Sequence, residues 1–377
     1  MIYDVAVIGA GCAGWQLLYQ LSLRKDWANL KIILLEENEI PKIYPTWCFW
    51  TKKNHPLEFL SSKIWDEISI ATPNQIVNKS IFPYRYIYIE GESFYDYFNH
   101  KFLPNNPNIT FRKPVKASFV EKNQNKIFQI STNEGIINAK KVYSSKDFNV
   151  SNDSDYIHLS QNFKGWRVKF DKKVLDPKKA LFMDFRHSSL NLFEFMYILP
   201  FSAEEGLVEW TTFIGKHQKE PNYELKIKEY LQNFFPEETY EILRHEEGEI
   251  PMTNFPFSLD EPNGITHIGT VAGMIKPSSG YTFNRITRDS VILAASFNNS
   301  SPYSSRIKNR FKYYDTLLLR ILRDEPEKAL PIFYALFENN TFTIILRFLD
   351  EETSIWEDIG IFSKLPILHL LKAIFKS

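Results

Sequence analysis

Apolar positions at the start of the chain follow first a strand period and then a helical period. Residues 3–8 are a β-branched apolar run, residues 9–14 contain three glycines, and residues 15–23 have apolar positions at helical spacing. The next apolar run, KIILLEEN, includes Glu36, which lies 22 residues after Gly14. This order predicts a strand, a turn, a helix and a second strand, which together form a βαβ unit.

The strongest antiparallel pattern lies in residues 192–213, LFEFMYILPFSAEEGLVEWTTF. An apolar strand, a polar turn around residues 202–206 and an alternating strand predict a hairpin. Side chains alternate between the faces of a strand. One face is therefore expected to carry Leu207, Glu209, Thr211 and Phe213, and the other Val208, Trp210 and Thr212.

The remaining pattern predicts further strands and helices. We expect a helix over residues 93–102 with Ser93 as its cap, strands within residues 109–133, and a helix over residues 223–243. Residues 265–297 resemble a buried strand, a glycine-rich loop and a helix. Residues 306–324 form a helical pattern that Pro326 should end, with one apolar stripe made of Ile307, Phe311, Tyr314, Leu318 and Ile321.

Composition and charge exclude several classes of protein. The chain has 377 residues, with 45 Lys plus Arg and 45 Asp plus Glu, so no net field favours nucleic acid. Its two cysteines, Cys12 and Cys48, form no metal-binding pattern, and we expect no metal. The start of the chain lacks the pattern of a secretory signal, and no apolar run reaches the length of a spanning helix, so we expect a cytoplasmic protein, soluble or peripheral to a membrane.

The glycines Gly9, Gly11 and Gly14 have the G-x-G-x-x-G spacing of a dinucleotide-binding loop. Gly9 permits the tight turn, Gly11 lets the backbone approach a pyrophosphate, and Gly14 lets the helix pack on the strand. The helix N-terminus would face the phosphates, and Glu36 would accept hydrogen bonds from the adenosine ribose. The alternative is a glycine turn without a ligand, but strand, helix and distal acid together favour dinucleotide binding.

The remaining glycines favour FAD over NAD as the bound dinucleotide. Among 14 glycines no second G-x-G-x-x-G occurs. FAD enzymes built like aromatic hydroxylases carry a later G-D-x6-P-x-x-G loop, and Gly269, Pro277 and Gly280 keep its spacing. Thr270 replaces the Asp, which makes ordinary hydroxylation less favoured. We expect FAD as the cofactor, with NAD(P)H only as an indirect source of electrons.

These elements predict a mixed α/β fold. We expect a Rossmann-like FAD-binding domain of the aromatic-hydroxylase type, a substrate domain with a mixed β-sheet, and C-terminal helices. The expected boundaries are residues 1–45, 90–155 and 255–300 for the FAD-binding domain, 46–89 and 156–254 for the substrate domain, and 301–377 for the helical region.

Five segments together resemble successive signatures of the lycopene cyclases of the bacterial carotenoid β-cyclase type. They are PTWCFW (45–50), LFMDFR (181–186), MYILPFSAEEGLVEWT (196–211), GEIPM (248–252) and IGTVAGMIKPSSGYTF (268–283). The resemblance covers nearly the whole chain. It implies an FAD-dependent cyclase that needs reduced FAD without net redox change, with Gly273 among the cofactor residues and Glu209 as the catalytic acid. Trp210 stands where many relatives have a second acid, so no paired carboxylate is expected at that position.

The chemistry of ring closure agrees with this role for Glu209. A proton must reach a terminal double bond, and burial among apolar residues raises the pKa of a carboxyl group so that it can donate near neutral pH. The alternative for Glu209 is a strand glutamate that faces solvent or forms a salt bridge. Asp184 and Arg186 in the MDFR segment are expected to form a structural ion pair.

The expected partner is lycopene or a related acyclic carotenoid, and lycopene partitions into lipid. Ile367, Leu370, Leu371 and Ile374 share one face of an amphipathic C-terminal pattern, which suits either a membrane interface or the core of the protein. We expect a protein peripheral to the inner face of the plasma membrane, in possible contact with other carotenoid enzymes. The alternatives are an FAD-dependent isoprenoid reductase or hydroxylase, and a flavoprotein scaffold without catalysis.

Overall fold

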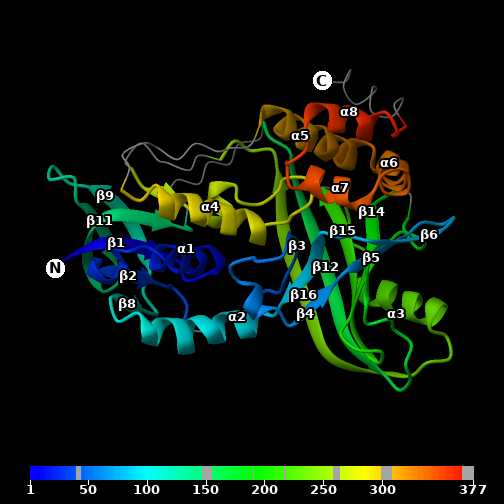
Figure 1. Cartoon of the computed structure of the whole chain (residues 1–377), viewed down its shortest axis with the longest axis horizontal. Coiled ribbons are helices and arrows are strands. Elements are labelled where there is room, and N and C mark those ends of the chain that lie inside the picture. The colour runs from blue at the N-terminus through cyan, green and yellow to red at the C-terminus, as the bar shows by residue number, and fades with distance from the viewer. Residues whose placement is uncertain are drawn as a thin grey trace.

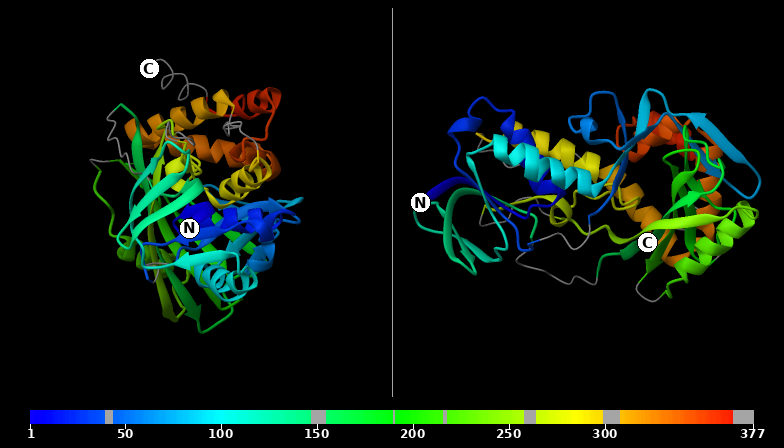
Figure 2. Two further views of the ribbon diagram at one scale, coloured as in Figure 1. Left: turned by 90° about the vertical axis from the view of Figure 1, so that its left-hand side faces the viewer. Right: turned by 90° about the horizontal axis from the view of Figure 1, so that it is seen from below.

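The computed structural model describes residues 1–39, 44–146, 155–189, 191–215, 218–257, 264–298 and 308–366. Within these residues the strands form three sheets, and helices cover their faces (Figures 1 and 2). Figure 1 shows the first sheet near the N-terminus, the second sheet on the opposite side, and the C-terminal helices over the second sheet.

The first sheet has the strand order β8–β2–β1–β11–β10–β9, and β17 pairs with β11. Its parallel strands are β1, β2, β8, β11 and β17, whereas β9 and β10 are antiparallel neighbours. The bounds are β1 Ile2–Ile8, β2 Ile32–Leu35, β8 Ile109–Arg112, β9 Ala117–Lys122, β10 Phe128–Thr132, β11 Gly135–Ser144 and β17 Thr266–His267. Helix α1 (Cys12–Ser22) joins β1 to β2, which confirms the predicted βαβ unit.

The second sheet has the order β16–β12–β15–β14–β13–β5–β6 and is antiparallel except between β13 and β5. Its strands are β5 Glu67–Ala71, β6 Ile76–Ser80, β12 His158–Phe170, β13 Lys179–Asp184, β14 Phe193–Pro200, β15 Glu205–Gly215 and β16 Tyr240–Thr253. Strands β14 and β15 pair in antiparallel register, as the sequence predicted. On β15, Val208 and Trp210 pack in the cluster beneath α3 (Tyr223–Phe234), whereas Leu207 and Phe213 pack towards the C-terminal helices.

A third, small sheet pairs β7 (Tyr84–Ile89) with β3 (Trp47–Lys52) and β4 (Lys63–Trp65). The remaining helices are α2 Gly91–Tyr97, α4 Phe283–Ala295, α5 Asn309–Asp324, α6 Pro326–Asn339, α7 Phe342–Leu349 and α8 Ile355–Phe362. Short 3-10 or π turns lie at Trp27–Asn29, Glu58–Leu60, Phe98–Phe102, Leu103–Asn105 and Gly269–Ala272. Helix α5 ends before Pro326, which begins α6, so the predicted stop is confirmed.

Two local predictions were wrong. Helix α2 begins at Gly91 after the N-cap Glu90, so Ser93 lies inside the helix and does not cap it. Residues 240–243 belong to β16 rather than to a helix, because α3 ends at Phe234 and the chain then pairs with β12. A ladder to a distant strand thus overrides the local helical pattern. Ile307 and the C-terminal residues 367–377 lie outside the described residues.

The predicted ion pair of Asp184 and Arg186 is confirmed as part of the core between β13 and α3. Asp184 is fully buried and accepts hydrogen bonds from Arg186 Nε at 2.9 Å and from the hydroxyl of Tyr230 on α3 at 2.5 Å. A buried carboxylate requires such partners, and these partners attach α3 to the outer face of the second sheet.

Candidate functional site: a glycine loop and an apolar cavity

The loop between β1 and α1 requires glycine at two positions, one for its positive φ and one for close packing. Gly9 has φ +100°, and a Cβ there would overlap the Ser145 hydroxyl. A Cβ on Gly14 would overlap the Gly9 carbonyl oxygen, so Gly14 allows α1 to pack closely on the loop. At Gly11, the N-cap of α1, a Cβ would meet no atom within 4 Å. The helix N-terminus is therefore open to a phosphate group.

Glu36, at the end of β2, is held beside this loop. The Ala10 amide donates to its Oε2 at 2.9 Å, and the Asn38 amide donates to its Oε1 at 2.9 Å. The structure thus brings together four of the predicted cofactor residues: Gly9, Gly11, Gly14 and Glu36. Their arrangement fits a dinucleotide whose phosphates face α1.

The second glycine segment reaches from α1 to the second sheet. Gly269 has φ +71°, and a Cβ there would lie 3.1 Å from the Ala13 Cβ on α1. Gly273 has φ +69° and lies beside Phe257, whereas Gly280, with φ +71°, lies against Gln161 and Ile250 of the second sheet. Pro277 lies in the loop between these two glycines. The predicted cofactor residues therefore form two groups, one at α1 and one beside the sheet.

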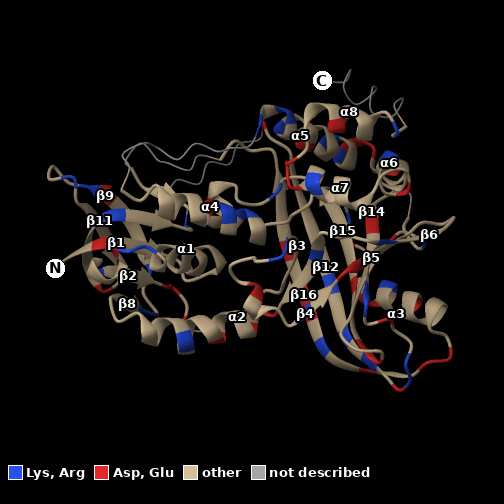
Figure 3. Ribbon diagram, viewed as in Figure 1, with Lys and Arg blue, Asp and Glu red and all other residues tan. Residues whose placement is uncertain are grey.

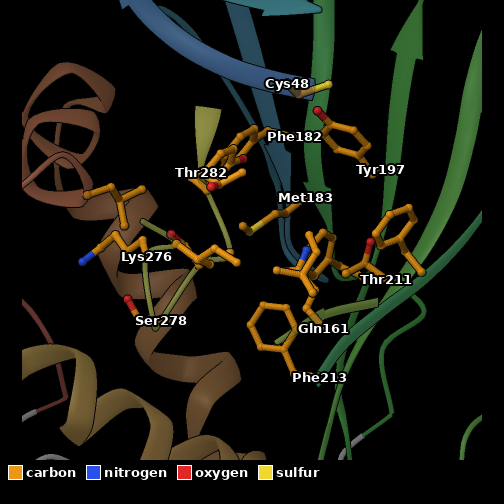
Figure 4. A pocket seen from close by; sticks show the side chains of 18 of the residues that line it. Cys48, Gln161, Phe182, Met183, Tyr197, Thr211, Phe213, Lys276, Ser278 and Thr282 are labelled. Atoms are coloured by element: carbon orange, nitrogen blue, oxygen red, sulfur yellow. The ribbon is translucent and has the colours of Figure 1, made fainter. Parts of the chain in front are cut away.

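An apolar cavity of about 930 Å³ lies between the second sheet, the 275–283 loop and helices α5 to α7. Figure 4 shows Tyr197, Thr211 and Phe213 projecting into it from the sheet and Lys276, Ser278 and Thr282 lying on the other side. The helices contribute Phe311, Tyr314, Leu317, Leu318, Ile321, Ile332, Phe333, Leu336, Phe337, Phe348 and Leu349. Such a lining suits a large apolar ligand.

Glu209 lies in the wall of this cavity, on the face of β15 that the alternating pattern predicted. Burial, together with the nearby Glu246 carboxyl, raises its pKa to about 8, and a hydrogen bond from Thr211 opposes this shift. That hydrogen bond runs from the Thr211 hydroxyl to Glu209 Oε1 at 3.3 Å. At neutral pH the side chain of Glu209 is therefore mostly an uncharged carboxylic acid that can donate a proton.

Three tyrosines that sequence analysis did not single out lie along the same cavity. Tyr197 on β14 stands directly opposite Glu209 in the ladder. The Tyr197 hydroxyl makes a hydrogen bond with the Tyr86 hydroxyl, which lies 3.5 Å from the hydroxyl of Tyr281. All three pKa values are raised, mainly by burial. The sequence could have indicated Tyr197, because it lies on the strand that was predicted to pair with the strand of Glu209. It could not have indicated Tyr86 and Tyr281, which come from distant segments.

Paired charges hold the 275–283 loop to the C-terminal helices. Lys276 donates to Asp315 on α5 at 2.7 Å and lies 3.4 Å from Glu351, which also pairs with Arg285 on α4. The Ser278 hydroxyl donates to the same Asp315 at 2.5 Å. This buried network, which we call the Lys276 network, fixes one wall of the cavity relative to the helices that cover it.

Charged residues of neither sign predominate in any part of the described chain. Figure 3 shows acidic and basic residues interspersed over both parts of the described chain. Within the described ranges, no group of three or more His, Cys, Asp and Glu side chains is placed to hold a metal ion. None of the described helices is long and apolar enough to cross a membrane.

Comparison of the sequence with known families supports the resemblance. A family model described as lycopene cyclase protein matches residues 4–374. The chain is 21% identical to a lycopene beta-cyclase from Pantoea ananas, over 99% of this chain and 98% of that protein.

Comparison of the structure with solved structures identifies the fold type. A geranylgeranyl bacteriochlorophyll reductase-like protein from Thermoplasma acidophilum matches with a TM-score of 0.57 and 13% identity, over 99% of this chain and 96% of that one. A probable FAD-dependent monooxygenase from Pseudomonas aeruginosa matches with a TM-score of 0.54 and 11% identity, over 96% and 100% of the two chains. A flavin-dependent brominase matches with a TM-score of 0.59 and 12% identity, over 96% of this chain and 97% of that one. The predicted mixed α/β fold, Rossmann-like and of the FAD-binding aromatic-hydroxylase type, is confirmed.

The raised pKa of Glu209 should make the stability of the fold depend on pH. Its pKa is about 8 in the folded protein against an ordinary value of 4.5. Between these values the unfolded chain loses its proton first, so stability falls as pH rises. We expect Glu209→Gln to leave the free energy of unfolding unchanged below about pH 4.5 and to increase it by a few kcal/mol above pH 8, at roughly 1.4 kcal/mol per pKa unit.

Urea unfolding at pH 4.5 and pH 9 measures this difference. Glu229→Gln, an exposed change on α3, is the control and should shift stability equally at both pH values. An equal effect of Glu209→Gln at the two pH values would contradict a raised pKa.

Proposed function

We propose, on the premise that this chain belongs to the lycopene cyclase family, that it converts the ψ-ends of lycopene into β-ionone rings. The product is β-carotene, formed by way of γ-carotene, and the reaction is an isomerisation without net redox change. The observation that carries the proposal is the carboxylic acid of Glu209, protonated at neutral pH in the wall of an apolar cavity. A proton donor inside an apolar cavity is what ring closure of a hydrocarbon requires.

The cofactor we propose is FAD, in its reduced form, with NAD(P)H as an indirect source of electrons. Two observations support a fit: the open space above Gly11 at the start of α1, and the Ser279 hydroxyl, which is buried without a hydrogen bond among the described residues. The residues that would hold FAD are Gly9, Gly11, Gly14, Glu36, Gly269, Gly273, Pro277 and Gly280. Reduced FAD, when bound, supplies an electron-rich surface near a developing cation.

The reaction begins with proton transfer from Glu209 to the terminal double bond of the substrate. The tertiary cation that results is attacked by the neighbouring double bond, which closes the ring, and the ring then loses a proton. Aromatic faces around the cavity, such as those of Phe182 and Tyr197, stabilise the cation without capturing it. The apolar helix residues opposite the sheet exclude the water that would otherwise add to it.

The substrate is expected to enter from a membrane surface, because an acyclic carotenoid partitions into lipid. Helix α8 exposes Ile355, Trp356 and Ile359, which share one side, and Trp356 is 78% exposed. Phe362, at the end of the same helix, lines the cavity. An apolar helix face beside the cavity supports a peripheral position at the inner face of the plasma membrane. Contact with other carotenoid enzymes stays a prediction.

The replacement Glu209→Gln should abolish cyclisation, since the amide cannot donate the proton. We expect product to fall by at least about 100-fold, the usual contribution of a general acid. The measurement is liquid chromatography of pigments from a lycopene-accumulating bacterial host that expresses each form. With purified protein, the wild-type rate should fall above pH 8 as Glu209 ionises. Glu229→Gln is the matched control and should keep full activity.

Lycopene left unchanged by a wild-type protein that retains FAD would overturn the cyclase proposal and favour a reductase or hydroxylase. Full activity of a folded Glu209→Gln variant would instead remove Glu209 from the reaction and leave the cyclase proposal standing.

The replacement Gly14→Ala should lower FAD retention, because the added Cβ overlaps the Gly9 carbonyl and displaces α1 from the loop. Gly360→Ala on α8 is the control, since a Cβ there meets no atom within 4 Å. The ratio of flavin absorbance to protein absorbance after purification measures retention. Equal flavin content in the two variants would contradict the assigned loop.

Replacing Ile355, Trp356 and Ile359 together by Ser should reduce binding to lipid vesicles at least several-fold, since it removes the exposed apolar face of α8. Co-sedimentation with vesicles of phosphatidylethanolamine and phosphatidylglycerol measures this binding. Phe119→Ser removes an equally exposed apolar side chain on β9 and is expected to leave binding unchanged. Unaltered binding of the triple variant would exclude this helix as the contact.

A further inference from the structure

A second glutamate lies in the same row of the sheet as Glu209. Gly165 on β12 is opposite Glu209 on one side and opposite Glu246 of β16 on the other. Residues directly opposite one another in a sheet point to the same face. Glu209 and Glu246 therefore project from the same face, towards the cavity that both line.

Gly165 removes the side chain that would otherwise separate the two acids. A Cβ at this position would lie 3.0 Å from Cδ1 of Leu207, and 3.1 Å and 3.3 Å from the Cβ and Cγ of Glu209. Glu209 thus leans over the glycine, in the direction of β16. Two strand spacings of about 4.8 Å separate the backbones of β15 and β16. This distance is within the reach of two glutamate side chains when the residue between them has no side chain.

Glu246 has the surroundings of an acid that faces a ligand. Its side chain is only 10% exposed, and its Oε1 makes no hydrogen bond among the described residues, with the Arg244 guanidinium 3.5 Å away. Burial raises the pKa of Glu246 and Glu90 adds to this rise, whereas Arg244, Arg167 and a hydrogen bond with Thr46 oppose it. Glu246 also raises the pKa of Glu209, so a negative charge on Glu246 favours the protonated form of Glu209.

We propose that Glu246 is a second catalytic carboxylate, which accepts the proton that the ring loses after Glu209 has protonated the substrate. In this step a C–H bond of the ring cation breaks, its electron pair becomes the ring double bond, and the proton passes to a Glu246 oxygen. The assignment rests on the proposed cyclisation. Glu246 on β16 would thus provide a second acid, which β15 lacks because Trp210 follows Glu209.

The pair returns to its starting state without any other reactant. Each turnover removes one proton from Glu209 and adds one to Glu246. Transfer of one proton across Gly165, directly or through a water molecule, restores both groups. Burial and the nearby Glu246 carboxyl raise the pKa of Glu209 to about 8, so the proton rests on Glu209 at neutral pH.

The pH profile of purified protein tests this role. The wild-type rate should be bell-shaped, since it needs Glu209 protonated and Glu246 ionised. In Glu246→Gln we expect kcat to fall at least about 100-fold, the acid limb to vanish, and the alkaline limb to move below the wild-type position near pH 8. Glu246→Asp should restore part of the rate together with the acid limb.

Two further variants complete the comparison. Gly165→Ala separates the acids by one methyl group and should also lower kcat and shift the alkaline limb. Glu241→Gln, an exposed change on the same strand, should keep both limbs and the full rate. Far-ultraviolet circular dichroism and flavin content should be the same for all variants.

The outcomes separate this inference from the proposed function. A wild-type protein that leaves lycopene unchanged overturns the cyclase proposal and with it the role of Glu246. If the wild type cyclises lycopene and Glu246→Gln keeps its kcat and its acid limb while only the alkaline limb moves, Glu246 merely adjusts the pKa of Glu209, and the catalytic assignment is overturned.

Discussion

The cost of removing carboxyl groups from water governs the arrangement of this molecule. In the Lys276 network, buried acids have cationic partners: Asp315 and Glu351 pair with Lys276 and Arg285. Glu209 has no ion pair among the described residues, and the charged group that raises its pKa is another acid, Glu246. Desolvation without a counterion makes the neutral acid the stable form. Glu209 therefore keeps its proton, because the described residues give it no ion-pair partner.

The second sheet makes a buried, unpaired acid possible because its outer face packs against α3 and its inner face lines the cavity. Its outer face packs Trp210 against α3 and keeps Asp184 paired with Arg186. This dense packing allows the inner face to leave space unfilled beneath the C-terminal helices. Alternation along β15 then puts Glu209 on the inner face and Trp210 on the outer face, one residue apart. A shift of one residue in register would exchange them and remove the acid from the cavity.

The sequence predicted the elements whose signals are local. The βαβ unit, the β14–β15 hairpin and the end of α5 before Pro326 all follow from periodicity and turn residues. The end of α3 and the row from Glu209 to Glu246 depend on pairing between distant segments. Gly165 could not be singled out from the sequence, because its backbone needs no positive φ. Its importance lies in the missing side chain, which no local pattern reveals. The division into domains stays a prediction.

The C-terminal helices are part of the cavity rather than an appendage to the two sheets. Helix α5 supplies Phe311 to the cavity and Asp315 to the Lys276 network, so one element both covers the cavity and anchors the loop across it. Helix α8 is fixed to α5 by Asp358, which accepts from Arg310 at 2.7 Å. A rigid chain of contacts therefore runs from the exposed face of α8 to the 275–283 loop. An apolar molecule that enters beside Phe362 would meet a preformed wall, and the position of that wall relative to Glu209 is set by buried charges.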